Sequence, residues 1–433
     1  MLSEKEKKVV REIDESREEI VELLRDFIGY KTISPRPQLD IDRSEHRDFT
    51  ALACEILEEL GFELDVWEVD PQKLENFPGS GVEPDKDLSD MPVVVGTRES
   101  SGDAKSLILN GHYDVVPAGK RKNWNHDPYG GEVVDDKVFG RGACDMKGGI
   151  VAMLKAIEFV ERVGIDFDGD LTVELVPDEE SGSMGTLSCC QRGYEADAAI
   201  IPEPTDMENI LLAMRGNQCG SITVFGRAGH ADNPQPHWRS GGAVNAITKS
   251  AKIIDCLKEL EEDWRDRPDK KHRLLPSDTI VPTIIEGGDW LIKYPEEVEI
   301  EFDANFIGTE NPREEIEEKV MTVAETDPWM KENPPEIEFY PWLYGAEVSE
   351  DEELVKTAKS VIRELFDTEL KPTGTGSLTD AIHLINYSEI PTISVGPSHT
   401  GAHETNEYIE IEELIKTTKI LALMVLRWCV FSQ

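Results

Sequence analysis

Short apolar runs that stop abruptly at ionisable side chains recur along this chain of 433 residues. Residues 107–112 have the sequence LILNGH, and residues 171–180 have the sequence LTVELVPDEE. Aliphatic and β-branched runs of this length indicate buried strands. In open α/β sheets, ligand sites lie beyond the carboxyl ends of the strands. We therefore expect the polar residues that follow these runs to meet at one edge of a sheet.

The order of the predicted elements indicates an α/β protein. Strand-like and helix-like stretches alternate between about residues 92 and 211, which favours a largely parallel sheet. Residues 1–35 precede them and predict an amphipathic helix rather than a signal peptide. Its apolar side chains recur at helical spacing among charged ones and are Val10, Ile13, Ile20, Leu24 and Phe27.

Residues 214–340 follow a different order, and we predict that they form an inserted module. The strand-like stretches are 221–225, 279–285, 298–302 and 337–339, and the helix-like ones are 242–260 and 314–324. Their order, βαββαβ, is that of a ferredoxin-like unit. The α/β pattern then resumes with a helix near 354–365 and a strand at 392–395. The interrupted first domain is therefore expected to comprise residues 1–213 and 341–433.

The charge balance is strongly acidic, with 88 acidic and 45 basic residues and a formal net charge of −43. Nucleic acid and anionic membranes are therefore not expected as partners. The acidic residues are scattered along the chain, which is typical of a folded protein with a heavily hydrated surface. Concentrated salt would screen their repulsion, so we predict a salt-adapted protein. The other interpretation is an unusually acidic mesophilic protein.

The cysteines and the apolar segments favour a cytoplasmic protein. Seven cysteines show no paired C-x-x-C spacing, so neither a thiolate zinc site nor a disulfide framework is expected. The apolar run at 420–426 is too short to span a bilayer and ends at Arg427. Together with the missing signal peptide, these features predict a cytoplasmic location.

Five side chains offer oxygen or nitrogen donors of the kind that two divalent ions require: His112, Asp145, Glu180, Glu203 and His403. A dinuclear hydrolytic site needs a bridging carboxylate, neutral imidazoles, further carboxylates and an unligated acid or base. In an extended His-x-Asp segment the two side chains share one face, so Asp114 can accept the second N–H of His112. The recurrence of such donors after strand-like runs predicts one shared metal site.

The local sequences around these donors leave other interpretations open. Adjacent Glu179 and Glu180 repel each other unless cations neutralise them, so one can bind metal while the other acts as a base; alternatively they form a solvated turn. Asp145 lies in a glycine-rich turn that leads into a helix, where it could instead be an N-cap. Flanking prolines stiffen the loop of Glu203, and His403 could be a surface histidine.

Several blocks of this sequence resemble one family of co-catalytic metallopeptidases. The blocks are residues 112–117, 140–149, 177–182, 203–205 and 403–408. They are similar, in order and over nearly the whole chain, to acetylornithine deacetylase, succinyl-diaminopimelate desuccinylase, aminoacylase and glutamate carboxypeptidase. The resemblance implies an aminopeptidase-like α/β catalytic domain with a parallel-rich mixed sheet. It also implies two zinc ions, with cobalt as another possible metal, and an inserted lid and dimerisation domain.

The resemblance also assigns roles to the donors. His112 and Glu203 are implied to hold one ion, Glu180 and His403 the other, with Asp145 between them. Glu179 then matches the general base of the family. Asp114 matches its histidine-orienting aspartate.

Residues of the inserted module and its boundary match further family positions. His230 resembles the lid histidine that stabilises an oxyanion, although a glycine-flanked loop histidine is more often structural. Arg215 and Asn245 match substrate-binding positions. Asn305 and Ile382 depart from the family, since many relatives have basic residues there that bind a substrate carboxylate. The acyl group of the substrate therefore stays open.

The reaction implied by these features is hydrolysis of the amide bond of a small N-acyl amino acid, with acetylornithine as the leading substrate. Dipeptides, carboxypeptidase substrates and succinyl-diaminopimelate are rivals of the same class. A non-catalytic binding protein on the same fold is a more distant hypothesis, because such a protein does not need the base Glu179. A homodimer is expected from the resemblance.

Overall fold

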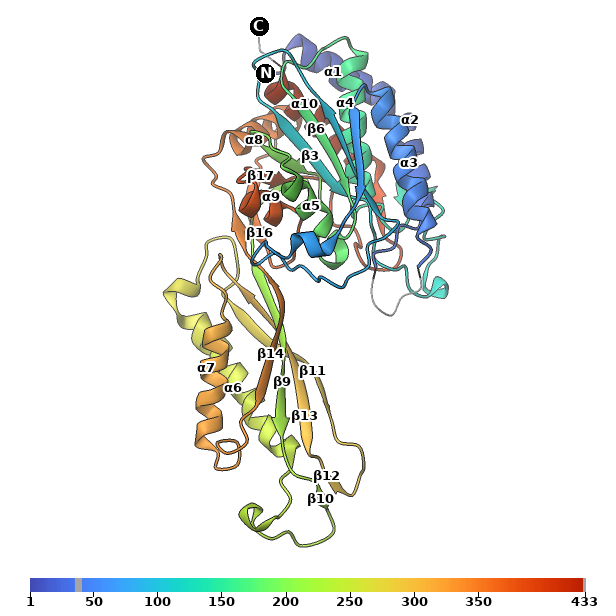
Figure 1. Cartoon of the computed structure of the whole chain (residues 1–433). Helices are drawn as coiled ribbons and strands as arrows, with labels where there is room; N and C mark the ends of the chain where they lie inside the picture. The colour runs from blue at the N-terminus through green and yellow to red at the C-terminus, as the bar shows by residue number, and fades with distance from the viewer. Residues whose placement is uncertain (36–40, 431–433) are drawn as a thin grey trace.

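A nine-stranded mixed sheet forms the centre of the larger of two domains in the computed structural model, which describes residues 1–35 and 41–430 (Figure 1). In spatial order the strands are β1 (Glu63–Glu68), β2 (Pro92–Arg98), β6 (Leu171–Val176), β3 (Leu107–His112), β7 (Ala199–Ile201), β17 (Thr392–Ser394), β8 (Asn209–Met214) and β15 (Ala346–Glu347), with β16 (Lys371–Thr375) beside β8. Strands β6, β3, β7 and β17 are parallel neighbours. Their carboxyl ends therefore lie at one edge of the sheet, as the sequence predicts.

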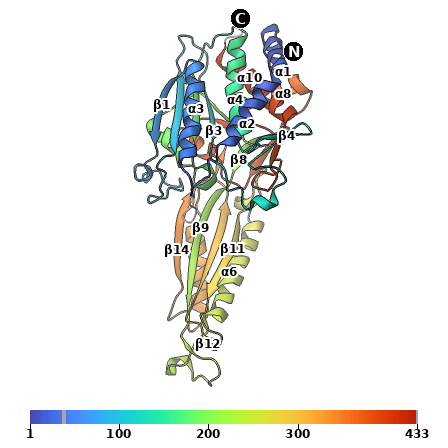
Figure 2. The ribbon, with the colours of Figure 1, turned by 90° about the vertical axis from the view of Figure 1, so that its right-hand side faces the viewer.

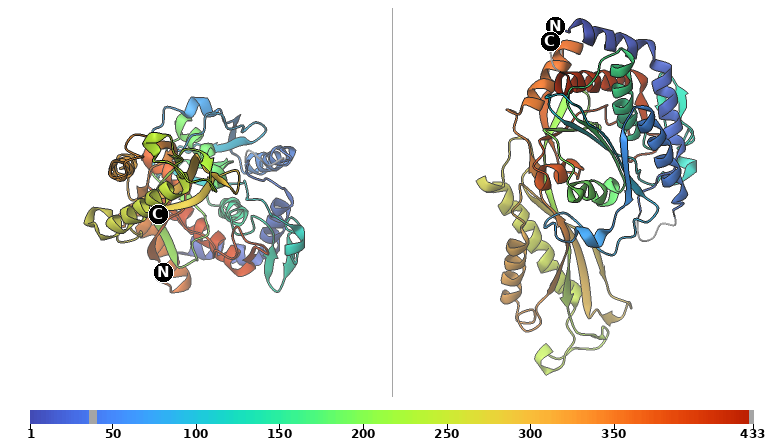
Figure 3. Two further views of the ribbon diagram at one scale, coloured as in Figure 1. Left: turned by 90° about the horizontal axis from the view of Figure 1, so that it is seen from below. Right: turned by 45° about the horizontal axis from the view of Figure 1, so that its top comes forward.

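Helices cover both faces of this sheet (Figures 1 and 3). One face packs against α1 (Glu4–Glu15), α2 (Arg17–Gly29), α3 (Ser44–Glu59), α4 (Lys147–Arg162), α8 (Glu353–Phe366) and α10 (Ile411–Cys429). The other face packs against α5 (Met184–Arg192) and α9 (Ala381–Tyr387). Residues of β3 alternate between the two cores, because successive side chains of a strand point to opposite faces. Sandwiched in this way, β3 is buried along its whole length.

The N-terminal segment forms two helices, where a single amphipathic helix was predicted. The break lies at Ser16, which separates α1 from α2 and donates its backbone N–H to the carbonyl oxygens of Glu12 and Ile13. The apolar stripe continues across the break, since Ile13 and Ile20 are both fully buried. Helical periodicity does not detect such a break, because the buried face remains continuous on both sides of it.

The smaller domain contains a four-stranded antiparallel sheet with two helices. Its strands are β9 (Gly216–Phe225), β11 (Thr279–Gly287), β13 (Glu297–Phe306) and β14 (Glu336–Leu343), and its helices are α6 (Ala246–Asp266) and α7 (Arg313–Thr326). The spatial order is β11-β13-β9-β14, and the chain order is βαββαβ, which is a ferredoxin-like unit. Figure 2 shows this domain extending away from the larger one as a long arm. The short strands β10 (Gly229–His230) and β12 (Lys293–Tyr294) pair at its far end (Figure 1).

The chain crosses between the domains at two places. Only Arg215 separates β8 from β9 on the way out, and residues 344–345 separate β14 from β15 on the return. That residues 214–340 act as a lid stays a prediction.

A small three-stranded sheet of β4 (Glu132–Val134), β5 (Lys137–Phe139) and β18 (Tyr408–Glu410) completes the larger domain. Across residues 1–35 and 41–430, no helix has both the length and the apolar composition that a membrane crossing requires.

Candidate metal centre

The five predicted metal-binding side chains come together at the carboxyl edge of the parallel strands. His112 is the last residue of β3, and Glu203 follows β7 by two residues. Glu180 lies in the one-turn helix η3 (Glu179–Ser181), which follows β6. Asp145 precedes α4, whose N-cap is Met146, so Asp145 is not the N-cap that the sequence left open. His403 lies in the loop between β17 and β18.

Their donor atoms form two groups that share Asp145. In one group, Nε2 of His112 lies 3.4 Å from Oδ1 of Asp145 and 3.6 Å from Oε1 of Glu203. In the other, Nε2 of His403 lies 3.2 Å from Oδ2 of Asp145 and 2.9 Å from Oε2 of Glu180. Within each group of three residues, the donor atoms lie within 4.8 Å of one another. The two oxygens of Asp145 thus face different histidines, as a bridging carboxylate requires.

Asp114 supports this arrangement in a way that differs from the expected one. Nδ1 of His112 lies 2.9 Å from the carbonyl oxygen of Asp114 but 3.6 Å from its carboxylate. The carboxylate instead accepts the backbone N–H groups of Glu179 (3.2 Å) and Glu180 (3.3 Å). Asp114 therefore orients His112 through its backbone and places the two glutamates through its side chain.

The turn that presents the two glutamates is held by Asp178. This residue has a left-handed backbone, with φ of 79°, which turns the chain sharply after β6. Its buried carboxylate lies 2.7 Å from Nζ of Lys86 and accepts the hydroxyl of Ser181 at 2.7 Å. These contacts fix the turn, so Glu179 and Glu180 do not form the freely solvated turn that the sequence left open.

Glu179 lies beside the first donor group but belongs to neither group. Its carboxylate is 9% exposed and lies 3.9 Å from Nε2 of His112. Burial raises the pKa of Glu179 well above its usual range, and the neighbouring carboxylates of Glu203 and Glu180 add to this shift. A carboxyl group with a raised pKa beside a cavity is suited to proton transfer near neutral pH.

The electrostatics of the cluster favour cations. Burial raises the pKa of Glu203 well above its usual range and also raises that of Glu180. Burial opposes protonation of His112, but the carboxylates around it outweigh this and raise its pKa well above the usual range. Hydrogen bonds to Asp145 and Glu180 raise the pKa of His403 to about 10. The carboxylates thus attract positive charge at the positions of both imidazoles.

The donor set fits two divalent ions. Among the described residues, Nε2 of His112 has no hydrogen-bond partner although it is buried. It faces the carboxylates of Asp145, Glu203 and Glu179, which is the environment of a nitrogen that binds a metal. Histidine and carboxylate donors without cysteine are the ligands of co-catalytic zinc and related ions.

A cavity of about 400 Å³ adjoins both donor groups. Apart from the metal donors and Glu179, its wall is formed mainly by uncharged side chains, which include Thr205, Asn209, Leu211, Thr373, Thr375, Ser377, Leu378 and Thr379. Among the described residues, no lysine or arginine lines it; Asp206 and His399 are the titratable residues of this wall. The cavity therefore offers a polar surface without fixed positive charge next to the metal donors.

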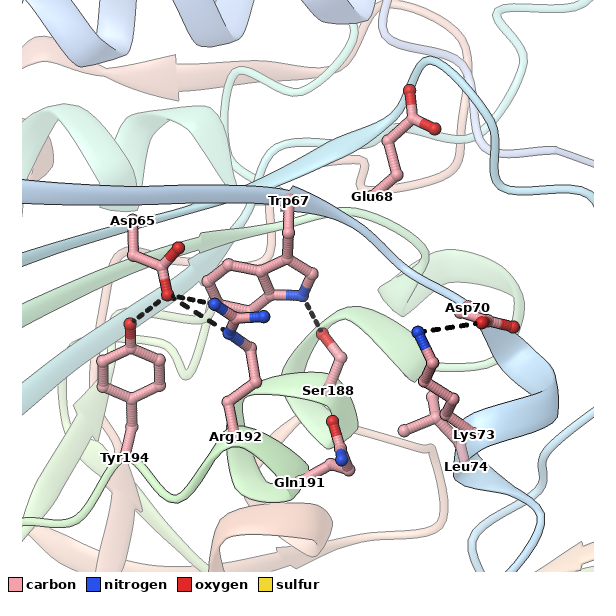
Figure 4. A pocket seen from close by; sticks show the side chains of 10 residues that line it. All are labelled: Asp65, Trp67, Glu68, Asp70, Lys73, Leu74, Ser188, Gln191, Arg192 and Tyr194. Atoms are coloured by element: carbon pink, nitrogen blue, oxygen red, sulfur yellow. Dashed lines mark hydrogen bonds and ion pairs between the residues drawn. The ribbon is translucent and has the colours of Figure 1, made fainter.

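A second cavity, of about 480 Å³, lies between β1 and α5 and has a different character (Figure 4). Its side chains are engaged with one another: Asp65 accepts hydrogen bonds from Arg192 and Tyr194, and the indole of Trp67 donates to Ser188. The guanidinium of Arg192 also lies over the ring of Trp67, 4.2 Å from its centroid. Neither group of potential metal donors lies here. The carboxyl edge of the sheet is therefore the candidate site.

The three candidate residues outside the larger domain are not brought to the metal donors. His230 lies in β10, exposed at the far end of the smaller domain. Asn245 caps α6 and accepts the backbone N–H of Thr248. Arg215 lies at the crossing between domains and donates to the carbonyl oxygen of Ser277. A Cβ on Gly376 would lie 2.6 Å from its Nη2, so the guanidinium lies close to the backbone between Thr375 and Ser377, two residues that line the cavity.

Two buried features near the site were missed by the sequence interpretation. Asp380 is fully buried at the start of α9, and burial raises its pKa to about 7. Arg141 and Glu407 form a buried ion pair behind Asp145. Arg141 and Glu407 lie in sequence blocks that carry the family resemblance, so the sequence shows two charged residues there. It does not show that they form an ion pair, because 265 residues separate them along the chain.

Comparison with known proteins shows which family these features belong to. Residues 108–427 match the profile of Peptidase family M20/M25/M40. The chain is 31% identical to N-formyl-4-amino-5-aminomethyl-2-methylpyrimidine deformylase of Halalkalibacterium halodurans, over 96% of each chain. It is 28% identical to succinyl-diaminopimelate desuccinylase of Marinobacter nauticus, over 72% of this chain and 81% of that one. The fold is similar to that of human carnosine dipeptidase 1, with a TM-score of 0.73 and 19% identity over 98% and 99% of the two chains.

Proposed function

The chain belongs to peptidase family M20/M25/M40, and on that premise we propose that it cleaves the amide bond of a small amine that carries a short acyl group. Membership of the family makes it a metal-dependent amidohydrolase or peptidase. The observation that carries the proposal is the arrangement at the sheet edge. Two groups of donors share Asp145 beside a cavity, and Glu179 remains outside both groups.

In this proposal two zinc ions occupy the two donor groups, with cobalt as the other candidate metal. His112 and Glu203 would hold one ion and Glu180 and His403 the other, with Asp145 shared between the two groups. The support is the geometry of the two groups and the attraction of the carboxylates for positive charge. Ions held there would acidify water and polarise the carbonyl of the substrate.

The remaining steps are assigned to side chains of this chain. Glu179 accepts a proton from the water that attacks the carbonyl carbon. It then donates that proton to the leaving nitrogen as the C–N bond breaks, which yields a free amine and a carboxylic acid. Its raised pKa supports both steps, because a more basic carboxylate accepts a proton from water more readily and holds it for transfer to the leaving nitrogen. Asp114 keeps Glu179 in place through the backbone hydrogen bond described above.

His230 is proposed to stabilise the oxyanion of the tetrahedral intermediate. At the far end of the smaller domain it cannot do so in the observed arrangement. Either the smaller domain folds over the cavity as a lid, or a second copy of the chain delivers the histidine. The exposed side chains of Trp290 and Leu291 lie next to β12, the strand that pairs with His230, and offer an apolar contact for either partner surface.

A homodimer is proposed through the smaller domain. Strand β11 forms one edge of its sheet, and its outer edge has no strand partner among the described residues. Apolar side chains of this strand are exposed, namely Val281, Ile284 and Ile285. An exposed apolar edge strand is a ready site for pairing with another chain.

A cytoplasmic location is also proposed, which agrees with seven cysteines that are all free thiols.

Two substrate classes follow from different observations. A cavity wall without lysine or arginine favours an uncharged acyl group such as formyl or acetyl, and the acetylornithine predicted from the sequence carries an acetyl group. The similarity to the deformylase over 96% of both chains points to the smallest acyl group. A succinylated substrate is the second candidate, because Arg215 lies close to Gly376, between the cavity-lining residues Thr375 and Ser377, and would bind a carboxylate if this segment moved. Dipeptides are the remaining rival of the same class.

The test is a set of hydrolysis assays with zinc-reconstituted protein at low and high salt. The substrates are the N-formyl aminopyrimidine named for the deformylases, N-formyl and N-acetyl amines including acetylornithine, succinyl-diaminopimelate, and dipeptides. We expect the highest kcat/KM among the formyl and acetyl compounds. A preference for succinyl-diaminopimelate or for dipeptides by tenfold or more, about 1.4 kcal/mol in transition-state stabilisation, would overturn the proposed substrate class.

A further inference from the structure

A buried ion pair lies directly behind the candidate metal centre. Nη1 of Arg141 lies 2.5 Å from Oε2 of Glu407, and both side chains are almost completely inaccessible, at 2% and 0% exposed. Arg141 comes from the glycine-rich turn that leads to Asp145. Glu407 comes from the loop that carries His403. The pair therefore joins the two segments that present the shared aspartate and the second histidine.

Further hydrogen bonds join the same two segments. The second carboxylate oxygen of Glu407 accepts the backbone N–H groups of Cys144 at 3.1 Å and Asp145 at 3.3 Å. Nη2 of Arg141 donates to the carbonyl oxygen of Glu404 at 3.1 Å. The backbone N–H of Gly140 donates to the carbonyl oxygen of Glu407 at 3.0 Å. Glu407 thus contacts the backbone of Asp145 itself, while Arg141 contacts the residue that follows His403.

The two metal groups differ in how their histidines are supported. His112 is the last residue of a buried central strand and is 1% exposed. His403 lies in a loop, its side chain is 55% exposed, and its φ is +63°, which is a left-handed conformation uncommon for a residue with a side chain. The position of His403 therefore depends on contacts that hold its loop, and the Arg141–Glu407 pair supplies buried ones.

We propose that Arg141 and Glu407 are positioning residues that hold Asp145 and His403 at the spacing required by the ion of the Asp145–Glu180–His403 group. This inference rests on the proposed dinuclear function. Residues behind metal ligands set the orientation of those ligands, and their replacement typically weakens metal binding about tenfold to 100-fold. The ion held by His112 and Glu203 should depend less on the pair, because strands β3 and β7 place those two ligands.

A purely stabilising role would have a different consequence. A buried ion pair can often be replaced by apolar residues of similar volume without loss of stability, whereas removal of one partner leaves an unpaired buried charge. An apolar pair at these two positions could therefore restore folding. It could not accept the N–H groups of Cys144 and Asp145 or donate to Glu404, so it would not restore the positions of the two metal-bearing segments.

The experiment is a titration of metal-free protein with Co²⁺, followed through its visible absorption, and with Zn²⁺ in competition with a chromophoric chelator. The variants are Glu407→Gln, Arg141→Lys and the double variant Arg141→Met with Glu407→Leu. In Glu407→Gln we expect the Kd of the ion at the Asp145–Glu180–His403 group, which the exposed position of His403 makes the weaker of the two, to rise about tenfold or more. The Kd of the tighter ion at His112 and Glu203 should change by less than about threefold. Arg141→Lys, which keeps the charge, should have a smaller effect. The double variant should melt at a higher temperature than Glu407→Leu alone, which leaves the charge of Arg141 buried and unpaired, but should not recover the affinity for the weaker ion.

Asp327 of the smaller domain provides a matched control. Its buried carboxylate lies close to two lysines and accepts the backbone N–H groups of Trp329 and Met330. Asp327→Asn should lower the melting temperature without changing either Kd. The inference would be overturned if Glu407→Gln weakened the binding of both ions equally, or if Asp327→Asn weakened it as much as Glu407→Gln does. Recovery of metal affinity in the apolar double variant would also overturn it. Wild-type protein that binds no ion would instead contradict the proposed function itself.

Discussion

Glu179 and the adjacent Glu180 have different surroundings in the folded chain. It adjoins Glu180 in sequence, yet Glu180 faces His403 and Asp145 while Glu179 faces the cavity and His112. The separation follows from the backbone of the turn after β6, which Asp178 and Asp114 hold in place. Two like charges so close together are stable when cations neutralise them.

The first prediction concerns the base. Glu179→Gln should reduce kcat by about 10²-fold to 10⁴-fold, because the amide can neither accept nor return the proton. Metal content, measured by elemental analysis, should stay at the wild-type value, since Glu179 belongs to neither donor group. A variant that keeps full kcat would remove Glu179 from the role of base. One that loses metal would make it a ligand.

The second prediction concerns the pH dependence of metal binding. In the ion-free protein the pKa of His403 is raised to about 10 and that of His112 is raised well above its usual range. His403 is therefore protonated at neutral pH, and a metal ion must displace this proton to bind. Affinity for zinc should rise as pH increases from about 6 to about 9, with proton release at each step. Calorimetry in buffers of different ionisation enthalpy measures this release, and constant affinity over the range would contradict the prediction.

At the level of elements, the smaller domain determines whether the site is complete. Its sheet and helices place His230 at the end that lies away from the metal donors (Figure 1). The chain connects the two domains only through Arg215 and residues 344–345. Short connections of this kind permit a domain to move as a unit while its internal structure is retained.

The third prediction tests the role of His230. His230→Ala should lower kcat by about 10²-fold or more, the loss typical of one oxyanion donor, with a smaller effect on KM. His237 lies in the same domain and serves as the matched control, since His237→Ala should leave kcat near the wild-type value. Loss of metal in His230→Ala would indicate a ligand, and an unchanged kcat would indicate a structural loop residue.

The fourth prediction tests the proposed dimer. Ile285 of β11 is 54% exposed, so a charge there should not disturb the core of its own domain. Ile285→Glu should convert the dimer to monomers, because it places a charge on the edge strand of each copy. Sedimentation velocity measures the mass. Val66→Glu, on the edge strand β1 of the larger domain, is the control and should leave the dimer intact. A wild-type monomer, or a dimer that survives the Ile285 substitution, would exclude this interface.

For the molecule as a whole, surface charge is the dominant property. The 45 basic residues can neutralise at most about half of the 88 acidic ones, which leaves a net charge of −43. Salt weakens the surface ion pairs, but each such pair contributes only about 0 to 1 kcal/mol. It also screens the repulsion among the excess carboxylates, and that effect should be the larger one.

The fifth prediction follows from this balance. The melting temperature should rise markedly between dilute buffer and about 1 M potassium chloride, where the Debye length falls to about 3 Å. A non-ionic osmolyte at the same osmolality should produce a smaller rise, because it does not screen charge. A melting temperature that stays constant or falls with added potassium chloride would contradict salt adaptation and favour the mesophilic interpretation.

Local patterns were sufficient for the elements and for the residue types of the site. Alternation of apolar runs and amphipathic stretches predicted the α/β sheet and the βαββαβ order of the smaller domain, because hydrophobic periodicity depends on neighbours a few positions away. The same patterns placed His112 and Glu203 at the ends of strands, where parallel connections bring such residues together. The break at Ser16 was missed, because the buried face is continuous across it.

Contacts between distant segments were decided only by the tertiary structure. The sequence alone determined the acidic composition of this chain, its α/β core and the residue types of its candidate metal donors. It did not determine that Asp114 orients His112 through a carbonyl oxygen, that Glu407 pairs with Arg141, or that His230 lies far from the cavity. Each of these depends on the distance between atoms that lie far apart in the sequence. No local pattern encodes such a distance, because it results from the packing of many elements against one another.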